Sequence, residues 1–132
     1  MNDLTFVADV LTRIRSRGGP FDERAYLFVL GAIEFLQGKL PARRHLSGAE
    51  VAWACRDLAW EQFGLLAPVV LAHWGITSTG SVGRVVFALV EGGLLVAQPG
   101  DSEADFADVY DFSVAFRSGY AWKGAEGTRF DT

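Results

Sequence analysis

Apolar residues recur every three or four positions over most of the chain, which is the spacing of amphipathic helices. The pattern predicts helices over residues 4–17, 23–38, 47–63, 65–74 and 79–92. Asp22 can cap the second of these, and Ser47 with Glu50 has the spacing of a capping box at the start of the third. The second helix is apolar on most sides, so it is predicted to be the central helix of the domain.

A strand–turn–strand pattern follows the fifth predicted helix. Residues 94–97 are Leu-Leu-Val-Ala, the tripeptide Pro99-Gly100-Asp101 is typical of a turn, and residues 106–110 suit a return strand. Asp111 can then cap a last short helix that reaches Arg117. The element order predicts a mainly α domain with a small antiparallel β-hairpin, winged-helix-like, over residues 1–118. Small and polar residues predict a loosely ordered tail over residues 119–132.

The negative charge of the predicted hairpin disfavours DNA binding. Residues 1–90 carry nine basic and eight acidic side chains, whereas residues 91–132 carry three basic and eight acidic ones. A wing that contacts phosphates should be basic. The acidic hairpin is represented by Asp101, Glu103, Asp105 and Asp108. Their spacing lacks the glycine and the final glutamate of a calcium loop, so we expect a solvated acidic surface that favours basic partners.

The composition indicates the cellular compartment and excludes some kinds of chemistry. Cys55 is the only cysteine, which excludes an intramolecular disulfide and suits a reducing interior. The N-terminus lacks the pattern of a signal peptide, and no apolar run approaches the roughly 20 residues of a spanning helix. A soluble, cytoplasmic protein is predicted. Two histidines and one cysteine cannot form a four-ligand zinc site, so we expect neither a metal nor a cofactor.

Two tryptophans stand out on the third predicted helix. Trp53 and Trp60 are seven residues apart and share a helical face with Arg56 and Asp57, opposite the apolar stripe. Trp and Arg are enriched at binding hot spots, and Arg56 could stack on either indole. The face predicts a protein interface or a homodimer contact. The alternative is that the N-terminal helix, or the tail with Tyr120 and Trp122, covers both rings.

Nucleic-acid binding is an alternative function. The helix over residues 79–92 has the place of a recognition helix, yet Arg84 is nearly alone among its outward residues. Arg43 and Arg44 form a short basic loop with His45. This reading predicts a winged helix-turn-helix regulator that contacts nucleic acid through Arg43, Arg44 and Arg84, and the acidic hairpin disfavours it.

The remaining alternative is a small enzyme whose site is completed by a dimer. Glu61 or Asp57 could form a dyad with His73, but a chain of this size allows many such pairs. We assign no catalytic residue. The sequence therefore favours a non-enzymatic interaction module that binds a protein partner or a second copy of itself, and no membrane.

A family resemblance rests on several short motifs. They are Arg56-Asp57-Leu58-Ala59, Gln62-Phe63-Gly64, His73-Trp74-Gly75-Ile76 and Leu89-Val90-Glu91-Gly92-Gly93-Leu94-Leu95. Over residues 20–117 the chain resembles the Minf_1886 family of small bacterial proteins, and it departs from the family pattern at Trp53 and Trp60. The family has no established activity, so the resemblance implies no catalytic or binding residue.

Overall fold

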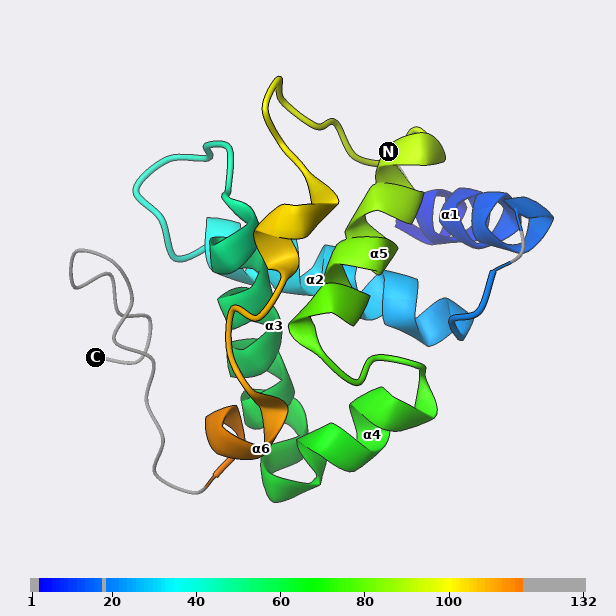
Figure 1. Cartoon of the computed structure of the whole chain (residues 1–132). Helices are drawn as coiled ribbons and strands as arrows, with labels where there is room; N and C mark the ends of the chain where they lie inside the picture. The colour runs from blue at the N-terminus through cyan, green and yellow to red at the C-terminus, as the bar shows by residue number, and fades with distance from the viewer. Residues whose placement is uncertain (1–2, 18, 118–132) are drawn as a thin grey trace.

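Helices make up the regular structure of the part of the chain that can be described (Figure 1). The computed structural model describes residues 3–17 and 19–117; the predicted tail, with Tyr120 and Trp122, lies outside these ranges. The long helices are α1 (Asp3–Arg17), α2 (Glu23–Gln37), α3 (Gly48–Phe63) and α5 (Thr79–Glu91). The short elements are α4 (Ala67–His73), α6 (Phe112–Ala115) and the 3₁₀ helices η1 (Gly64–Leu66) and η2 (Glu103–Phe106).

Local side-chain chemistry sets the starts of several helices, as the sequence predicts. The Asp22 carboxylate accepts a hydrogen bond from the backbone N–H of Arg24 at the start of α2. Ser47 and Glu50 form the expected capping box at the start of α3. Asp111 caps α6 by accepting from the backbone N–H of Ser113. These caps satisfy N–H groups that have no partner within the helix.

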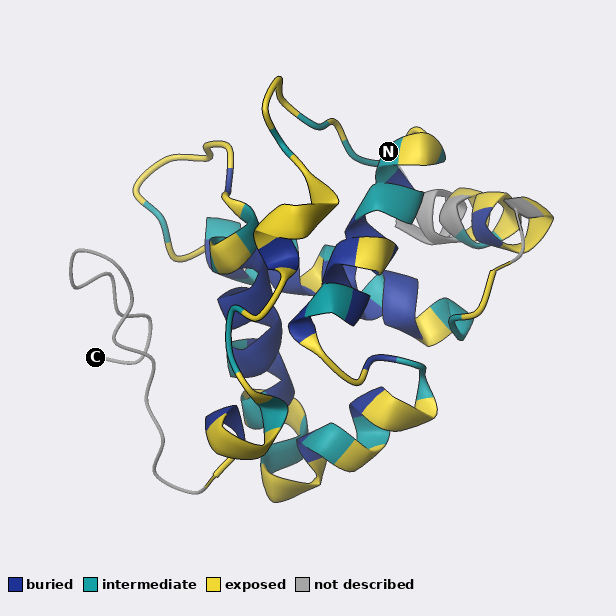
Figure 2. Ribbon diagram, in the orientation of Figure 1, coloured by how far each residue is buried: buried dark blue, intermediate teal, exposed yellow. Residues whose placement is uncertain are grey.

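The core lies where α2 meets α3 and α5, and α1 packs on α2 from outside (Figures 1 and 2). Among the described elements, α3 packs against α2, α4, α5, η1 and η2, whereas α2 packs mainly against α1, α3 and α5, so the prediction that α2 is the central helix is not confirmed. The fully buried side chains of α2, α3 and α5 are mostly aliphatic and small: Ala25, Val29, Ala32, Leu36, Ala52, Ala54, Ala59, Val82, Val85 and Leu89. Small residues let the helix axes approach closely, while the larger ones fill the space between them.

The predicted β-hairpin is absent. Within residues 3–17 and 19–117 the structure contains no strand, so the winged-helix-like fold class is wrong. Residues 94–102 form a loop with a turn closed by the Asp101 N–H and the Gln98 carbonyl, 2.9 Å apart. Residues 103–106, which the hairpin prediction placed in its tip and return strand, form η2 instead.

Backbone hydrogen bonds explain why these residues do not pair as strands. Gly93 has a left-handed φ of 81° at the end of α5, and the N–H of Leu94 donates to the carbonyl of Leu89 over 2.9 Å. The start of the expected strand therefore closes a helix. In the return segment, Ser102 and Asp105 form a capping box that begins η2. Asp108, with a φ of 52°, departs from extended geometry.

Candidate binding pocket

The segment that follows η2 covers the predicted tryptophan face. Residues 107–116, named here the covering segment, pass alongside α3 and include α6 (Figure 1). Trp53 is 8 % exposed and Arg56 is 5 % exposed, so the prediction that these two side chains face outward is wrong. The ring centres of Trp53 and Tyr110 lie 4.4 Å apart. The cover therefore comes partly from residues predicted as the return strand of a hairpin and partly from the short helix that Asp111 was predicted to cap.

Arg56 joins this covering segment to α3. Its Nε donates to the carbonyl of Ala115 over 2.8 Å, and its Nη1 lies 3.2 Å from Oδ1 of the half-buried Asp57. The guanidinium carbon also lies 5.3 Å from the ring centre of Trp60, which is half-buried. The expected stacking of Arg56 on an indole is thus confirmed for Trp60. Among the four predicted interface residues, Trp53 and Arg56 are buried, and the bond from Arg56 to Ala115 ties α6 to α3.

Burial also raises the pKa of groups at the contact between the covering segment and α3. The Tyr110 hydroxyl donates to the carbonyl of Ala52 over 2.8 Å, and burial, followed by the nearby Cys55 and Asp57, raises the pKa of Tyr110 well above its ordinary value. Burial raises the pKa of the Cys55 thiol to about 12. A thiol with such a pKa remains protonated at neutral pH, so Cys55 acts as a small apolar side chain.

The predicted acidic residues do not converge on one point. Asp101 accepts from the N–H of Gln98 and lies 3.2 Å from Nε2 of His45. Asp105 accepts from the N–H of Ser102 over 3.0 Å, and Glu103 and Asp108 are exposed. Over the described ranges, no group of three or more His, Cys, Asp or Glu side chains is arranged to hold a metal ion.

A pocket of about 240 Å³ opens between the core helices and two loops. Its apolar lining comes from α2, α3, α5, η2 and the loop that follows α5: Ile33, Val51, Val86, Phe87, Val90, Leu95 and Phe106. Its polar lining comes mainly from the loop before α3 and from residues 101–105, named here the acidic segment. The polar lining residues are Gln37, Arg43, Arg44, His45, Asp101, Ser102 and Asp105. The contact between His45 and Asp101 joins these two loops. An apolar pocket with a few polar groups is the usual form of a binding site.

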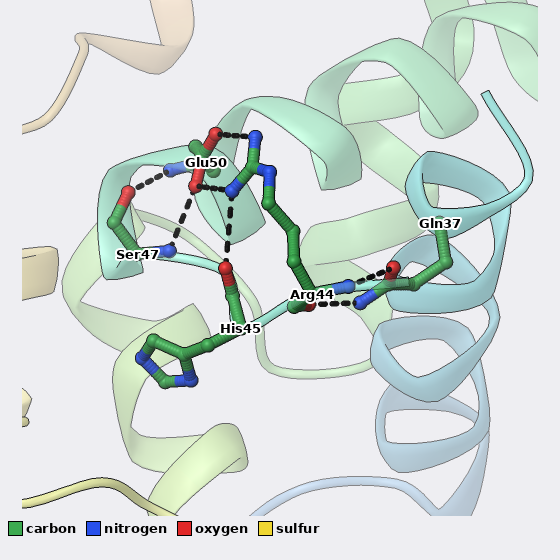
Figure 3. Close-up of polar contacts among 5 residues, drawn as sticks. All are labelled: Gln37, Arg44, His45, Ser47 and Glu50. Carbon is green, nitrogen blue, oxygen red and sulfur yellow. Dashed lines mark hydrogen bonds and ion pairs between the residues drawn. The ribbon is translucent and has the colours of Figure 1, made fainter. Parts of the chain in front are cut away.

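A hydrogen-bond network holds the loop before α3 in place (Figure 3). Gln37 donates to the carbonyl of Arg44 over 2.6 Å and accepts from its N–H over 3.2 Å. The Arg44 guanidinium makes two parallel contacts with the Glu50 carboxylate, of 3.0 and 2.7 Å. It also donates to the carbonyl of His45 over 3.0 Å. Because Glu50 is also the capping-box residue, the cap of α3 and this wall of the pocket share one carboxylate.

The basic residues predicted for nucleic acid are not brought together. Arg43 pairs with Glu34 over 2.8 Å, and Arg44 pairs with Glu50, both beside the pocket. Arg84 donates to the hydroxyl of Ser81 and lines a separate hollow with Phe21 and Glu91. Residues 94–110 form no wing, and the basic residues are divided between two sites.

Some of the residues that line the pocket were predicted from the sequence as site residues, and others were not. Arg43, Arg44, Asp101 and Asp105 are among the named residues. Gln37 and the apolar lining were not singled out as site residues. A helical pattern marks Ile33, Val86 and Val90 only as inward residues, and no local signal shows that the inward faces leave a space between them.

Removing the charge of Glu50 should make the stability of the fold depend less on pH in the acidic range. The Arg44 guanidinium, followed by other hydrogen bonds, holds the pKa of the Glu50 carboxyl below its ordinary value. A carboxyl with a lowered folded-state pKa stabilises the fold above its unfolded pKa, and this stabilisation disappears as the pH falls through the folded value. We therefore expect Glu50→Gln to lower the urea midpoint at pH 7 and to approach the wild-type midpoint below about pH 4.

Glutamine can still serve in a capping box, so the substitution tests the charge and not the cap. The matched control is Glu61→Gln, which changes an exposed glutamate of the same helix. A constant difference between Glu50→Gln and wild type from pH 7 to pH 3 would contradict the proposed role of the ion pair with Arg44.

No α-helix in the described part of the chain is both long and apolar enough to cross a membrane. No family model matches this chain, and neither a curated protein nor a solved structure does so. The resemblance to the Minf_1886 family therefore stays a prediction from the sequence.

Proposed function

We propose that this protein is a non-enzymatic interaction module that binds a protein partner by accepting one apolar side chain of that partner into the pocket. The observation that carries the proposal is the pocket itself, with its apolar interior and charged rim. Interface hot spots are commonly large side chains that fill a desolvated pocket, surrounded by a polar rim.

The size of the pocket favours a side chain over a cofactor. Pockets for drug-sized ligands usually measure about 300–1,000 Å³. An apolar cavity of about 150 Å³ is enough to hold a benzene ring. The volume of about 240 Å³ lies between these values and suits one leucine, phenylalanine or tryptophan side chain.

The charges around the pocket favour a basic partner segment. Arg43 and Arg44 already pair with Glu34 and Glu50. The neighbouring acidic segment offers Asp105 and Glu103, which are exposed and stand in no ion pair found in the described part of the chain. Opposite charge beside an apolar contact mainly improves association rate and specificity. The partner residue that enters the pocket is therefore flanked by lysine or arginine.

The proposal is tested by NMR titration with short peptides. The probes are the capped tripeptides Ac-Lys-Leu-Lys-NH₂ and Ac-Glu-Leu-Glu-NH₂. Burial of one leucine side chain contributes about 1.5–3 kcal/mol, so the dissociation constant should be on the order of 10 mM. We expect the backbone amide signals of Val51, Val90 and Phe106 to shift with the lysine peptide, and more weakly with the glutamate peptide.

A pocket-filling variant supplies the specific control. Ala97 lines the pocket from the half-buried loop, so Ala97→Phe should occupy the space and remove the shifts. Ala104→Phe adds the same ring at an exposed alanine that does not line the pocket, and it should leave the shifts unchanged. The proposal fails if neither peptide shifts these signals at about 50 mM, or if Ala97→Phe binds as wild type does.

A further inference from the structure

Two loops border the pocket, and they are held in different ways. The loop before α3 is fixed by the hydrogen-bond network of Figure 3. The loop over residues 94–102 is bonded to the end of α5 through Leu94 and Leu95, and to itself in the turn over residues 98–101. Val96, between these two points, lines the pocket and is 89 % exposed. The position of this second loop therefore depends on what holds its turn.

The contact between His45 and Asp101 holds the turn against the opposite loop. Nε2 of His45 lies 3.2 Å from Oδ1 of Asp101, and both residues line the pocket. The other oxygen of the same carboxylate, Oδ2, accepts from the N–H of Gln98 over 2.8 Å. The network before α3 uses the carbonyl of His45, and Figure 3 shows its ring pointing away from that network. One carboxylate thus closes the turn and joins it to the fixed loop.

Histidine is the side chain that ordinarily changes its charge between about pH 5 and pH 8. A protonated imidazole adds an ionic attraction to its hydrogen bond with a carboxylate. We infer that the contact between His45 and Asp101, named here the clasp, makes access to the pocket depend on pH. Protonation of His45 tightens the clasp and restricts entry of a ligand side chain, and loss of the proton loosens it. The inference rests on the proposed function, because it concerns the same pocket.

The positive charges near His45 are already balanced. Arg43 and Arg44 stand on the same loop and oppose a further positive charge. Each is paired, however: Arg43 with Glu34 of α2 over 2.8 Å, and Arg44 with Glu50 of α3 over 2.7 Å. Their repulsion of a protonated imidazole is therefore reduced.

The opposite side of the pocket supplies negative charge. Asp101 is accompanied by Asp105 of η2, which also lines the pocket. The part of α5 that lines the pocket carries no charge, so it adds nothing to this balance. Among the lining residues, the carboxylates of Asp101 and Asp105 therefore favour a protonated His45.

The exposure of the clasp limits the size of its effect. The side chains of His45 and Asp101 are 36 % and 27 % exposed. Ion pairs at such positions contribute little, so the effect should be about two- to fivefold. A contact that must open before binding lowers the apparent affinity in proportion to the fraction of molecules in which it is open. We therefore expect ligand binding about two- to fivefold weaker at pH 5.5 than at pH 7.5.

NMR titration with the uncharged peptide Ac-Ala-Leu-Ala-NH₂ at these two pH values tests the clasp. An uncharged probe avoids direct repulsion between a protonated His45 and a lysine of the ligand. Wild type should bind more weakly at the lower pH, whereas His45→Gln and Asp101→Asn should bind equally at both. The asparagine carbonyl can still accept from the N–H of Gln98, so Asp101→Asn keeps the turn. His73→Gln changes an exposed histidine that does not line the pocket, and it should behave as wild type does.

Hydrogen exchange of the free chain tests the clasp without a peptide. The N–H of Asp101 donates to the carbonyl of Gln98 over 2.9 Å, so its protection from exchange reports how firmly the turn is held. After correction for the intrinsic effect of pH on exchange, this protection should be about two- to fivefold higher at the lower pH in wild type and in His73→Gln. It should be equal at the two pH values in His45→Gln.

The two measurements separate failure of the clasp from failure of the proposed function. If no peptide binds at either pH, the proposed function fails, and hydrogen exchange alone decides on the clasp. Equal protection of the Asp101 N–H in wild type at the two pH values overturns the inference. When the peptide binds, equal affinity of wild type at both pH values, or pH-dependent binding by Asp101→Asn, overturns it as well.

Discussion

Replacement of Arg56 by methionine is expected to lower the free energy of unfolding by about 3 kcal/mol. Arg56 is 5 % exposed, and its guanidinium bonds both the Ala115 carbonyl and the Asp57 carboxylate. Removing one partner of a buried pair leaves the other charge uncompensated, which typically costs about 3–5 kcal/mol. Because the Asp57 side chain retains 17 % exposure, the lower end of this range applies. Urea unfolding followed by tryptophan fluorescence measures the change.

A second substitution separates the charge effect from the loss of packing. The double variant Arg56→Met, Asp57→Leu removes both charges and should recover part of the lost stability, because the half-buried Asp57 carboxylate that loses the Arg56 guanidinium in the single variant is no longer present. Arg56→Lys keeps a positive charge but cannot reproduce the planar contacts of the guanidinium, so it should remain destabilised. A loss below about 1 kcal/mol in Arg56→Met would mean that the contact with Ala115 does not hold the covering segment in place.

Truncation of Phe106 to alanine is expected to cost about 3–5 kcal/mol, the usual loss for a buried phenylalanine. Phe106 is 3 % exposed, and its ring meets the edge of Phe87 with a distance of 6.4 Å between ring centres. It is the large apolar side chain that attaches η2 to α5, and it also lines the pocket. The same variant should therefore reduce peptide binding at the pocket. Equilibrium unfolding and the NMR titration measure the two effects.

A pair of glycine substitutions tests the same contact from the side of α5. An added Cβ at Gly83 would lie 2.8 Å from the Cβ of Phe106, so Gly83→Ala should destabilise by about 1–3 kcal/mol. At Gly31, an exposed position of α2, the nearest side-chain atom to an added Cβ is 3.9 Å away. There the better helix propensity of alanine should stabilise by up to about 1 kcal/mol. The two substitutions should therefore change the free energy of unfolding in opposite directions. A stabilising Gly83→Ala would show that Phe106 does not pack against α5 at this point.

A sequence pattern predicts only the local contacts of the candidate pocket. Ser47 and Glu50 were identifiable as a capping box because the relevant atoms are three residues apart. The ion pair of Glu50 with Arg44 and the hydrogen bonds between Arg44 and Gln37 depend on the path of a loop, which periodicity does not describe. His45 and Asp101 are 56 residues apart in the chain, so no local pattern could place them together.

The sequence by itself determined where several helices begin and which face of α5 is apolar, because caps and helical spacing act within one or two turns. Only the tertiary structure decided the conformation of residues 94–110. Their strand-like composition was overridden by the burial of Phe106 against Gly83 and by the hydrogen bond from Arg56 to Ala115. Trp53, on a face that looked polar and outward, became internal because that segment returned over it. A strand needs a partner strand for its backbone groups, and here side-chain caps and core contacts satisfied the segment without one.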